Sequence, residues 1–371
     1  MEFKKVLIDW YRKNKRDLPW RNTHNPYHIW ISEVILQQTR VAQGLEYYLR
    51  FIETFPTIRD LAESEIDKVM KVWQGLGYYT RARNLQEGAR QILTNYNAEI
   101  PKSYNELLKI KGIGPYSAGA IASFAFREVV PAIDGNVYRV LSRVFGIFTS
   151  SETTTGKKEF FNLAMELIDE KQPDVFNQAM LDFGALQCIP RNPDCLNCPF
   201  TEICYAHRNN LVNHLPAKAK KLKVRDRYFS YLLIRYKNHT FIKRREEGDI
   251  WTSLYEFPLI ETKSLVELED LMEDPVWIDL FGKQSLKILY VSKPVKHPLS
   301  HQTLYIRFIM LQIMKPTYYL KSNYQQVEIE SIDEYSTPRV IDNFMAAEPA
   351  EKYFRTRNDN SDKSHRSKND Q

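Results

Sequence analysis

The spacing of apolar positions divides the chain into two parts with different periods. From the N-terminus to about residue 210, apolar residues recur three or four positions apart, which is typical of one face of an α-helix. Strand-like alternation is nearly absent here, so we expect a mainly α domain over residues 1–210. Its helices are expected over residues 3–10, from Asn25 and Pro26 onward, and over residues 81–96, 137–145 and 157–168.

Beyond this part the pattern changes to that of β-strands. Runs rich in aromatic and β-branched residues occupy residues 228–236, 239–244, 286–291 and 303–313, as strands require. Residues 265–272 form a candidate helix. We therefore expect a second, α+β domain over residues 228–347.

Two other segments are too polar to build a core. Residues 211–227 are rich in lysine and arginine, and we expect them to form a basic linker between the domains. Residues 348–371 end in asparagine, aspartate, serine, lysine and arginine. A segment of that composition cannot bury enough apolar surface to fold, so we expect a disordered tail.

The charge balance is mildly basic. The chain has 371 residues, and 52 lysines and arginines against 46 aspartates and glutamates give a formal net charge of +6. This excess fits a nucleic-acid partner, although many proteins carry such a surplus. No run approaches the roughly 20 apolar residues of a membrane helix, and the N-terminus lacks the apolar run of a secretory signal. We expect a cytoplasmic monomer with no membrane partner.

The chain has only 4 cysteines, and all of them lie in one short segment. Scattered disulfides would not cluster in this way, and a reducing cytosol would not keep them. Four thiolates in one loop suit either tetrahedral zinc or an iron–sulfur cluster. Structural zinc sites usually pair two close Cys–Cys knuckles, whereas only Cys195 and Cys198 form one here, so the spacing favours iron–sulfur. The ligands would be Cys188, Cys195, Cys198 and Cys204, separated by six, two and five residues.

A glycine-containing turn precedes this loop. Gly112 and Gly114 flank Ile113, between an apolar helix end and a helix expected from about Tyr116. Two glycines permit a tight turn whose N–H groups can approach a phosphate beside a helix N-terminus. An ordinary helix C-cap is the alternative.

Two acidic residues have surroundings that suit chemistry. Glu33 lies inside a largely apolar stretch, residues 30–41. Burial would raise its pKa and suit it to general-acid work near neutral pH, and the alternative is a solvated or salt-bridged helix glutamate. Asp134 and Asn136 precede a helix, where either is a good N-cap.

The cysteine spacing and the glycine turn together resemble the endonuclease III, or helix–hairpin–helix, superfamily of base-excision DNA glycosylases. The resemblance implies a structural [4Fe-4S] cluster that orders a DNA-contacting loop. It also implies that Gly112 and Gly114 belong to a hairpin that holds the DNA backbone, often with a bound monovalent cation. The catalytic aspartate of the superfamily stands at Asp134, where a carboxylate can stabilise the positive charge that develops on the deoxyribose.

Residues 30–41 resemble the signature of adenine DNA glycosylases, the MutY family, and the match covers essentially the whole helical region. It assigns Glu33 to protonation of adenine. Strand-cutting relatives carry a lysine just after the hairpin, where Tyr116 stands here, so imine chemistry is unavailable and a monofunctional enzyme is implied. Tyr116 is expected to hydrogen-bond near Asp134.

The same resemblance fills in residues around the base and the duplex. Arg16, Trp20, Leu36 and Gln178 match positions around the extruded adenine, and Asn136 lies near the catalytic carboxylate. Residues that wedge the duplex are needed because flipping a base costs a few kcal/mol of stacking and pairing. They are matched by Gln38, Thr39, Leu76 and Tyr78.

The second domain resembles the Nudix-like C-terminal domain of the same family, on residues 248–258 and 297–301. The acidic residues after Pro258 lack the Arg-Glu-x-x-Glu-Glu pattern that holds magnesium, so pyrophosphate hydrolysis is not expected. The resemblance assigns 8-oxoguanine recognition to Leu299, Ser300 and His301. Many members carry phenylalanine at the first position, so the stacking contribution of Leu299 is open.

These features imply a glycosylase that removes adenine paired with 8-oxoguanine or guanine in double-stranded DNA. Asp134 would act electrostatically or by transient attack. One alternative is a bifunctional endonuclease III-like glycosylase and AP lyase, which Tyr116 and the second domain oppose. Another is a silent DNA-binding module or a nucleotide pyrophosphatase, which would make Glu33 and Asp134 coincidental or need an intact Nudix motif.

Overall fold

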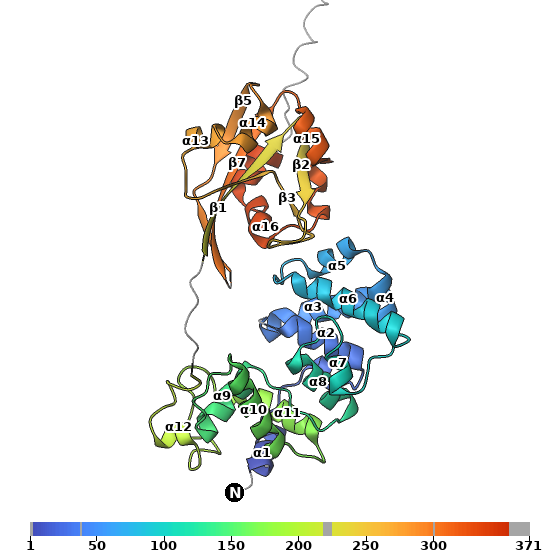
Figure 1. The fold of residues 1–371 in the computed structure, drawn as a ribbon, viewed down its shortest axis with the longest axis vertical. Helices are drawn as coiled ribbons and strands as arrows, with labels where there is room; N and C mark the ends of the chain where they lie inside the picture. The colour runs from blue at the N-terminus through green and yellow to red at the C-terminus, as the bar shows by residue number, and fades with distance from the viewer. Residues whose placement is uncertain (1–2, 38, 218–224, 300, 356–371) are drawn as a thin grey trace, which may run out of the picture. The chain divides into compact units, whose positions relative to one another are not determined.

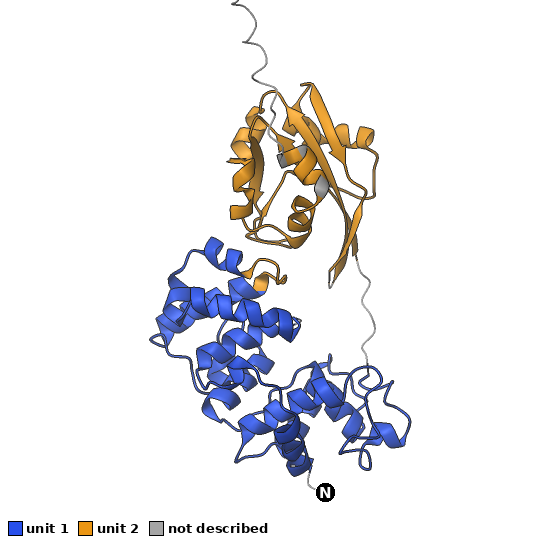
Figure 2. Ribbon diagram, turned by 180° about the vertical axis from the view of Figure 1, so that it is seen from behind, with its two compact units in different colours: residues 1–72, 81–221 blue, residues 73–80, 222–371 orange. Residues whose placement is uncertain are grey.

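A computed structural model describes residues 3–37, 39–217, 225–299 and 301–355, with helices in the first part and strands with helices in the second (Figure 1). The order confirms the expected fold class. By their contacts, the described residues form two compact units, one from residues 1–72 and 81–221 and one from residues 73–80 and 222–371 (Figure 2). No helix in the described ranges is long and apolar enough to cross a membrane.

The helical part contains short and medium helices joined by turns and loops. They are α1 (Phe3–Asn14), α2 (Pro26–Leu36), α3 (Val41–Thr54), α4 (Ile58–Glu63), α5 (Ile66–Trp73), α6 (Thr80–Asn95), α7 (Tyr104–Leu107), α8 (Pro115–Phe126), α9 (Gly135–Phe145), α10 (Thr154–Leu167), α11 (Pro173–Asp182) and α12 (Tyr205–Arg208). A 3₁₀ turn at Pro19–Arg21 precedes α2, and a π-helix at Phe183–Gln187 extends α11.

Helix α2 packs on α3 and α8. Its start is fixed by Asn25, whose side chain accepts a hydrogen bond from the Tyr27 N–H, and by Pro26 in the first turn. Apolar residues surround the helix, and every residue from Ile29 to Ile35 is buried. A helix that is apolar on all sides belongs in a core. Glu33 is therefore carried into the interior by its neighbours.

The second unit is built on two sheets. In the larger one, β4 (Leu259–Thr262), β1 (Arg225–Arg235), β7 (Gln302–Ile313) and β5 (Leu286–Val291) lie in that order, and β6 (Val295–Pro298) also pairs with β7. The smaller one orders β3 (Tyr255–Glu256), β2 (His239–Arg244) and β8 (Gln325–Glu328). Strands β1 and β7 run parallel, and the other pairs are antiparallel.

Both faces of the central strands are covered. Phe229, Tyr231 and Leu233 of β1 belong to one apolar core, whereas Leu232 and Ile234 belong to another. Such burial on both faces explains the continuous apolar run in the sequence. Further helices cover the sheets, namely α13 (Leu268–Met272), α14 (Pro275–Phe281), α15 (Tyr318–Asn323), α16 (Arg339–Met345) and α17 (Glu348–Ala350), with a 3₁₀ turn at Ile329–Glu334.

Two expected boundaries are wrong. The tail was expected to begin at residue 348, but α17 and a π-helix at Glu351–Arg355 continue the second unit. Ala350 and Phe354 are fully buried in its core, where the Phe354 ring meets that of Phe257 at 5.9 Å. The rest of the expected tail, residues 356–371, lies outside the described residues.

The linker is also shorter than residues 211–227. At its start, Leu215 is buried and its carbonyl accepts a hydrogen bond from Arg143 Nε at 3.1 Å. At its end, β1 begins at Arg225. Arg227 looked like a linker charge, but its side chain is buried between two carboxylates. Residues 218–224 lie outside the described residues.

Candidate active site

A cavity of about 440 Å³ opens in the helical unit between α2, α8, α9 and α11. Its lining unites the acids Glu33 and Asp134, which are a hundred positions apart in the sequence. It includes nine of the residues expected at the site, namely Arg16, Trp20, Glu33, Leu36, Thr39, Tyr116, Asp134, Asn136 and Gln178. A concave site with a few convergent polar groups is where binding and catalysis are first expected.

Glu33 is buried in this lining and is held by Tyr116, whose hydroxyl donates a hydrogen bond to Glu33 Oε2. Burial raises the pKa of Glu33 to about 7, while Tyr116 and Arg21 pull it down. A carboxyl group with that pKa holds a proton in many molecules near neutral pH and can transfer it. The sequence had placed the hydrogen bond of Tyr116 near Asp134. The structure gives it to Glu33 because the buried carboxylate of α2 faces the first turn of α8.

Asp134 is both the N-cap of α9 and part of the cavity lining. Its Oδ1 accepts the N–H groups of Asn136 and Val137 at 2.8 and 2.9 Å, and Oδ2 accepts Asn136 Nδ2 at 2.7 Å. Burial raises the pKa of Asp134 above its ordinary value, and these hydrogen bonds oppose the rise. The capping role therefore does not exclude a chemical one, because the cap fixes the carboxylate where it lines the cavity.

Asn136 is itself held by Arg139, an arginine that also binds the start of the cysteine loop. Arg139 donates to Asn136 Oδ1 at 2.8 Å, to the Gly184 carbonyl at 2.7 Å and to the Cys188 carbonyl at 2.8 Å. Gly184 allows close packing, because a Cβ there would lie 2.6 Å from the Cβ of Asn136. Arg139 thus links Cys188, the first cysteine of the loop, to Asn136, which binds Asp134.

The polar wall around the expected adenine pocket contains residues that the sequence did not single out. Tyr11 donates its hydroxyl to Gln178 Oε1 at 2.7 Å. Asp182, whose side chain is fully buried, binds Arg16 at 2.6 Å and Arg21 at 2.5 Å. The sequence offered one signal for Asp182, because it is an acidic residue at the end of a largely buried helix. Nothing local marks Tyr11, whose partner is 167 residues away.

Other residues expected to contact DNA lie outside the cavity lining. Leu76 is buried, and Tyr78 is about half exposed with a φ of +48°. Gly112 has a φ of +83°, and a Cβ there would lie 2.9 Å from the Cβ of Asn84. Gly114 is the N-cap of α8. Gln38 lies outside the described residues.

The four cysteines gather around one small cavity of their own, together with Arg143. All four are free, and Arg143 Nη1 lies 3.5 Å from Cys188 Sγ. Among the described residues, no three histidine, cysteine, aspartate or glutamate side chains are arranged to hold a metal ion.

The segment expected to recognise 8-oxoguanine is the turn between β6 and β7. The Leu299 N–H donates to the Gln302 carbonyl at 2.8 Å, which closes the turn. Leu299 is half-buried and packs on the core of the second unit, whereas His301 is exposed. Ser300 lies outside the described residues.

Comparison with known proteins agrees with both parts of the fold. Residues 31–169 match the HhH-GPD superfamily of base excision DNA repair proteins, and residues 230–347 match the NUDIX domain. The chain is similar to a solved thermostable thymine-DNA glycosylase, with a TM-score of 0.52 and 28% identity, over 56% of this chain and 95% of that one.

The chain is also similar to proteins that are named adenine DNA glycosylases. An adenine DNA glycosylase of Buchnera aphidicola subsp. Baizongia pistaciae is 35% identical over 328 residues, which are 86% of this chain and 89% of that protein. The adenine DNA glycosylase of Mus musculus is 42% identical over 215 residues, which are 56% of this chain and 42% of that protein. The chain therefore belongs to the adenine DNA glycosylase family, acts on DNA and removes adenine in base-excision repair.

Proposed function

We propose that the protein is a monofunctional adenine glycosylase that acts on adenine opposite 8-oxoguanine or guanine. The observation that carries the proposal is the pairing of Glu33, which can carry a proton, with the fixed carboxylate of Asp134 in one cavity. The cavity also has the size expected of a small-ligand site.

Glu33 donates its proton to N7 of the flipped adenine, so the base leaves as a neutral molecule. The bond between N9 and the sugar C1′ breaks, and its electron pair goes to the base. The sugar becomes an oxocarbenium ion, which the Asp134 carboxylate stabilises at close range. Water then adds to C1′ and loses a proton to a carboxylate, which leaves free adenine and an abasic sugar.

The lining supports hydrolysis without strand cleavage. Of the described residues around the cavity, none is a lysine, so this wall supplies no amine to form an imine with the sugar. Tyr116 occupies the position where the bifunctional relatives carry that lysine, and it binds Glu33 instead. Borohydride trapping tests the point, and a covalent protein–DNA adduct would favour the glycosylase–lyase alternative.

The residues at the pocket and the duplex have separate proposed tasks. Arg16, Trp20, Leu36 and Gln178 surround the extruded base, and Thr39, Leu76 and Tyr78, with Gln38, support the opened duplex. The hairpin at Gly112 and Gly114 holds the DNA backbone, with a monovalent cation as in the superfamily. The turn at Leu299, Ser300 and His301 reads the opposite 8-oxoguanine. We propose that the protein acts as a monomer.

We also propose that the cysteine loop holds a [4Fe-4S] cluster, although no three of the described thiols are arranged to hold a metal ion in this structure. Four thiols around one cavity are the donor set of such a cluster, and the Arg143 guanidinium beside Cys188 suits the negative charge of four thiolates. When bound, the cluster orders residues 188–204 and does no redox chemistry on the base. Iron and inorganic sulfide analysis of the purified protein tests this, and bound zinc without sulfide would contradict it.

Excision assays on duplexes that pair adenine with 8-oxoguanine, guanine or thymine test the substrate. We expect the fastest release opposite 8-oxoguanine, slower release opposite guanine and the slowest opposite thymine. Equal rates on all three duplexes would contradict a role in 8-oxoguanine repair.

A further inference from the structure

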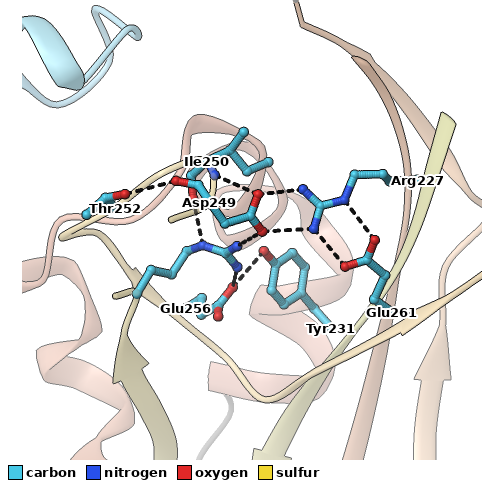
Figure 3. Close-up of polar contacts among 8 residues, drawn as sticks. Arg227, Tyr231, Asp249, Ile250, Thr252, Glu256 and Glu261 are labelled. Carbon is cyan, nitrogen blue, oxygen red and sulfur yellow. Dashed lines mark hydrogen bonds and ion pairs between the residues drawn. The ribbon is translucent and has the colours of Figure 1, made fainter. Parts of the chain in front are cut away.

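The second unit contains a network of five charged side chains that the proposed chemistry does not use (Figure 3). Arg227 of β1 and Arg245 after β2 bind the carboxylates of Asp249, Glu256 and Glu261. Both arginine side chains are less than a tenth exposed, at 9% and 8%. Buried charges persist only when they are paired and hydrogen-bonded, so the two buried arginines depend on these carboxylate partners.

Asp249 is the centre of the network (Figure 3). Its Oδ1 and Oδ2 accept Arg227 Nη1 and Nη2 at 2.6 and 2.8 Å, a bidentate pair, and Oδ2 also accepts Arg245 Nη2 at 2.8 Å. Glu261 binds the other edge of Arg227 with two contacts of 2.7 Å. Arg245 and the Tyr231 hydroxyl both donate to Glu256. Asp249 alone joins the two arginines.

The network holds one loop, residues 245–254. Inside it, the Thr252 hydroxyl donates to the Asp249 carbonyl at 2.9 Å, and Arg245 Nε donates to the Ile250 carbonyl at 2.9 Å. The loop is closed by the Arg245 N–H, which donates to the Leu254 carbonyl at 2.8 Å. Trp251 has a φ of +60°. A tryptophan keeps that conformation only where surrounding contacts determine it.

Trp251, within this loop, contacts β6, the strand that leads to the turn proposed to recognise 8-oxoguanine. The rings of Trp251 and His297 lie 5.8 Å apart, and the rings of Trp251 and Phe229 lie 6.4 Å apart. His297 belongs to β6, two residues before Leu299. The guanidinium of Arg227 lies over the Phe229 ring at 4.7 Å, so the same arginine supports both Asp249 and the ring behind Trp251.

We infer that Trp251 is a positioning residue for the turn at residues 299–301, which is proposed to recognise 8-oxoguanine. The Arg227–Asp249–Arg245 network fixes Trp251, and Trp251 in turn fixes the position of this turn through its contact with His297. The inference rests on the proposed function, because it concerns how that turn is held. Trp251 acts through His297 and does not itself read the base. Rigid support of this kind gives a contact residue its specificity, since a loose turn pays ordering entropy on binding.

The test compares single-turnover excision of adenine opposite 8-oxoguanine with excision opposite guanine in the full chain. We expect Trp251→Leu to lower the ratio of the two rates by about tenfold, the discrimination that one base contact supplies. Trp251→Phe keeps a ring against His297 and should therefore retain most of the wild-type ratio. The rate opposite guanine should stay near the wild-type value, which a general loss of folding would not allow.

Asp249 and Glu261 provide a matched pair of variants, because both bind Arg227 but only Asp249 belongs to the loop. Asp249→Asn should lower the same ratio, whereas Glu261→Gln should leave it unchanged. If both variants lowered the ratio equally, or if neither did while both remained folded by thermal unfolding, the inference would be wrong.

His301→Ala separates this inference from the proposed function. A lower ratio for His301→Ala with an unchanged ratio for Trp251→Leu would overturn the inference and leave the role of the turn intact. An unchanged ratio for His301→Ala would contradict the turn as the reader of 8-oxoguanine, and the inference with it. In the Trp251→Leu background, His301→Ala should have a smaller effect than in the wild type, because the two act in series.

Discussion

The hydroxyl of Tyr116 donates a hydrogen bond to the Glu33 carboxylate, which joins residues 83 positions apart in the sequence. The contact stabilises the charged form of Glu33 and so opposes the larger effect of burial, which raises the pKa to about 7. The balance leaves Glu33 with a proton in many molecules near neutral pH and still able to release it. Tyr116 therefore tunes the pKa of the proposed proton donor.

The excision rate should fall as the pH rises through about 7, because deprotonated Glu33 has no proton to give. It should fall again at acidic pH, where protonation of Asp134 removes the carboxylate that stabilises the sugar. Because burial raises the pKa of Asp134, single-turnover rates measured from acidic to alkaline pH would show this bell-shaped profile. A flat profile over that range would speak against Glu33 as the acid.

Glu33 should also make folding depend on pH. Its pKa rises from 4.5 to about 7 on folding, so the folded state binds the proton more tightly. The contribution that this tighter proton binding makes to the free energy of unfolding is complete below pH 4.5. It is lost as the pH rises through about 7. Glu33→Gln avoids the buried charge, so at alkaline pH it should be more stable than the wild type, by at most about 3 kcal/mol. Urea unfolding at acidic and alkaline pH measures the difference, and an equal difference at both would contradict the burial argument.

Tyr116→Phe should move the alkaline fall of the rate profile to higher pH. The substitution removes the hydrogen bond that lowers the pKa of Glu33 and leaves the effect of burial. Tyr138→Phe is the control, because that ring packs on Phe160 with a centroid distance of 5.0 Å. A profile for Tyr116→Phe that coincided with the control would show that the hydrogen bond has no such role.

Tyr11→Phe should slow adenine release about fivefold, the usual worth of one hydrogen bond. Tyr11 donates to Gln178 Oε1, which leaves the Gln178 amide nitrogen as the donor available to the base. In a Gln178→Ala background, the same substitution should have almost no further effect, because its only proposed action is through that amide. Single-turnover rates of the four proteins form the cycle, and additive losses would rule out this route.

Local signals in the sequence predicted much of the fold and the centre of the site. The cap at Asn25, the apolar positions of α2 and the cysteine spacing are short-range patterns, and the structure contains the helix and a cavity lined by the cysteines. The strands that were missed are short, such as β3 with 2 residues and β6 with 4, and have too few positions to show an alternation.

The errors have a common physical cause. Arg227, Asp182 and Phe354 take their roles from partners that are distant in sequence, and no local pattern reveals a partner. Arg227 looked like a linker charge until its two carboxylates were known. Phe354 looked like part of a polar tail until the core around Phe257 was known. Burial decided each case, and burial is a property of the folded chain.

The most direct test of the account is single-turnover release of adenine from a duplex that pairs it with 8-oxoguanine, by the wild type and by Glu33→Gln. Glutamine keeps the size and the burial of the side chain but cannot supply the proton. The account predicts that Glu33→Gln binds the duplex as the wild type does and releases adenine at least about a hundredfold more slowly. Release at the wild-type rate would contradict Glu33 as the general acid.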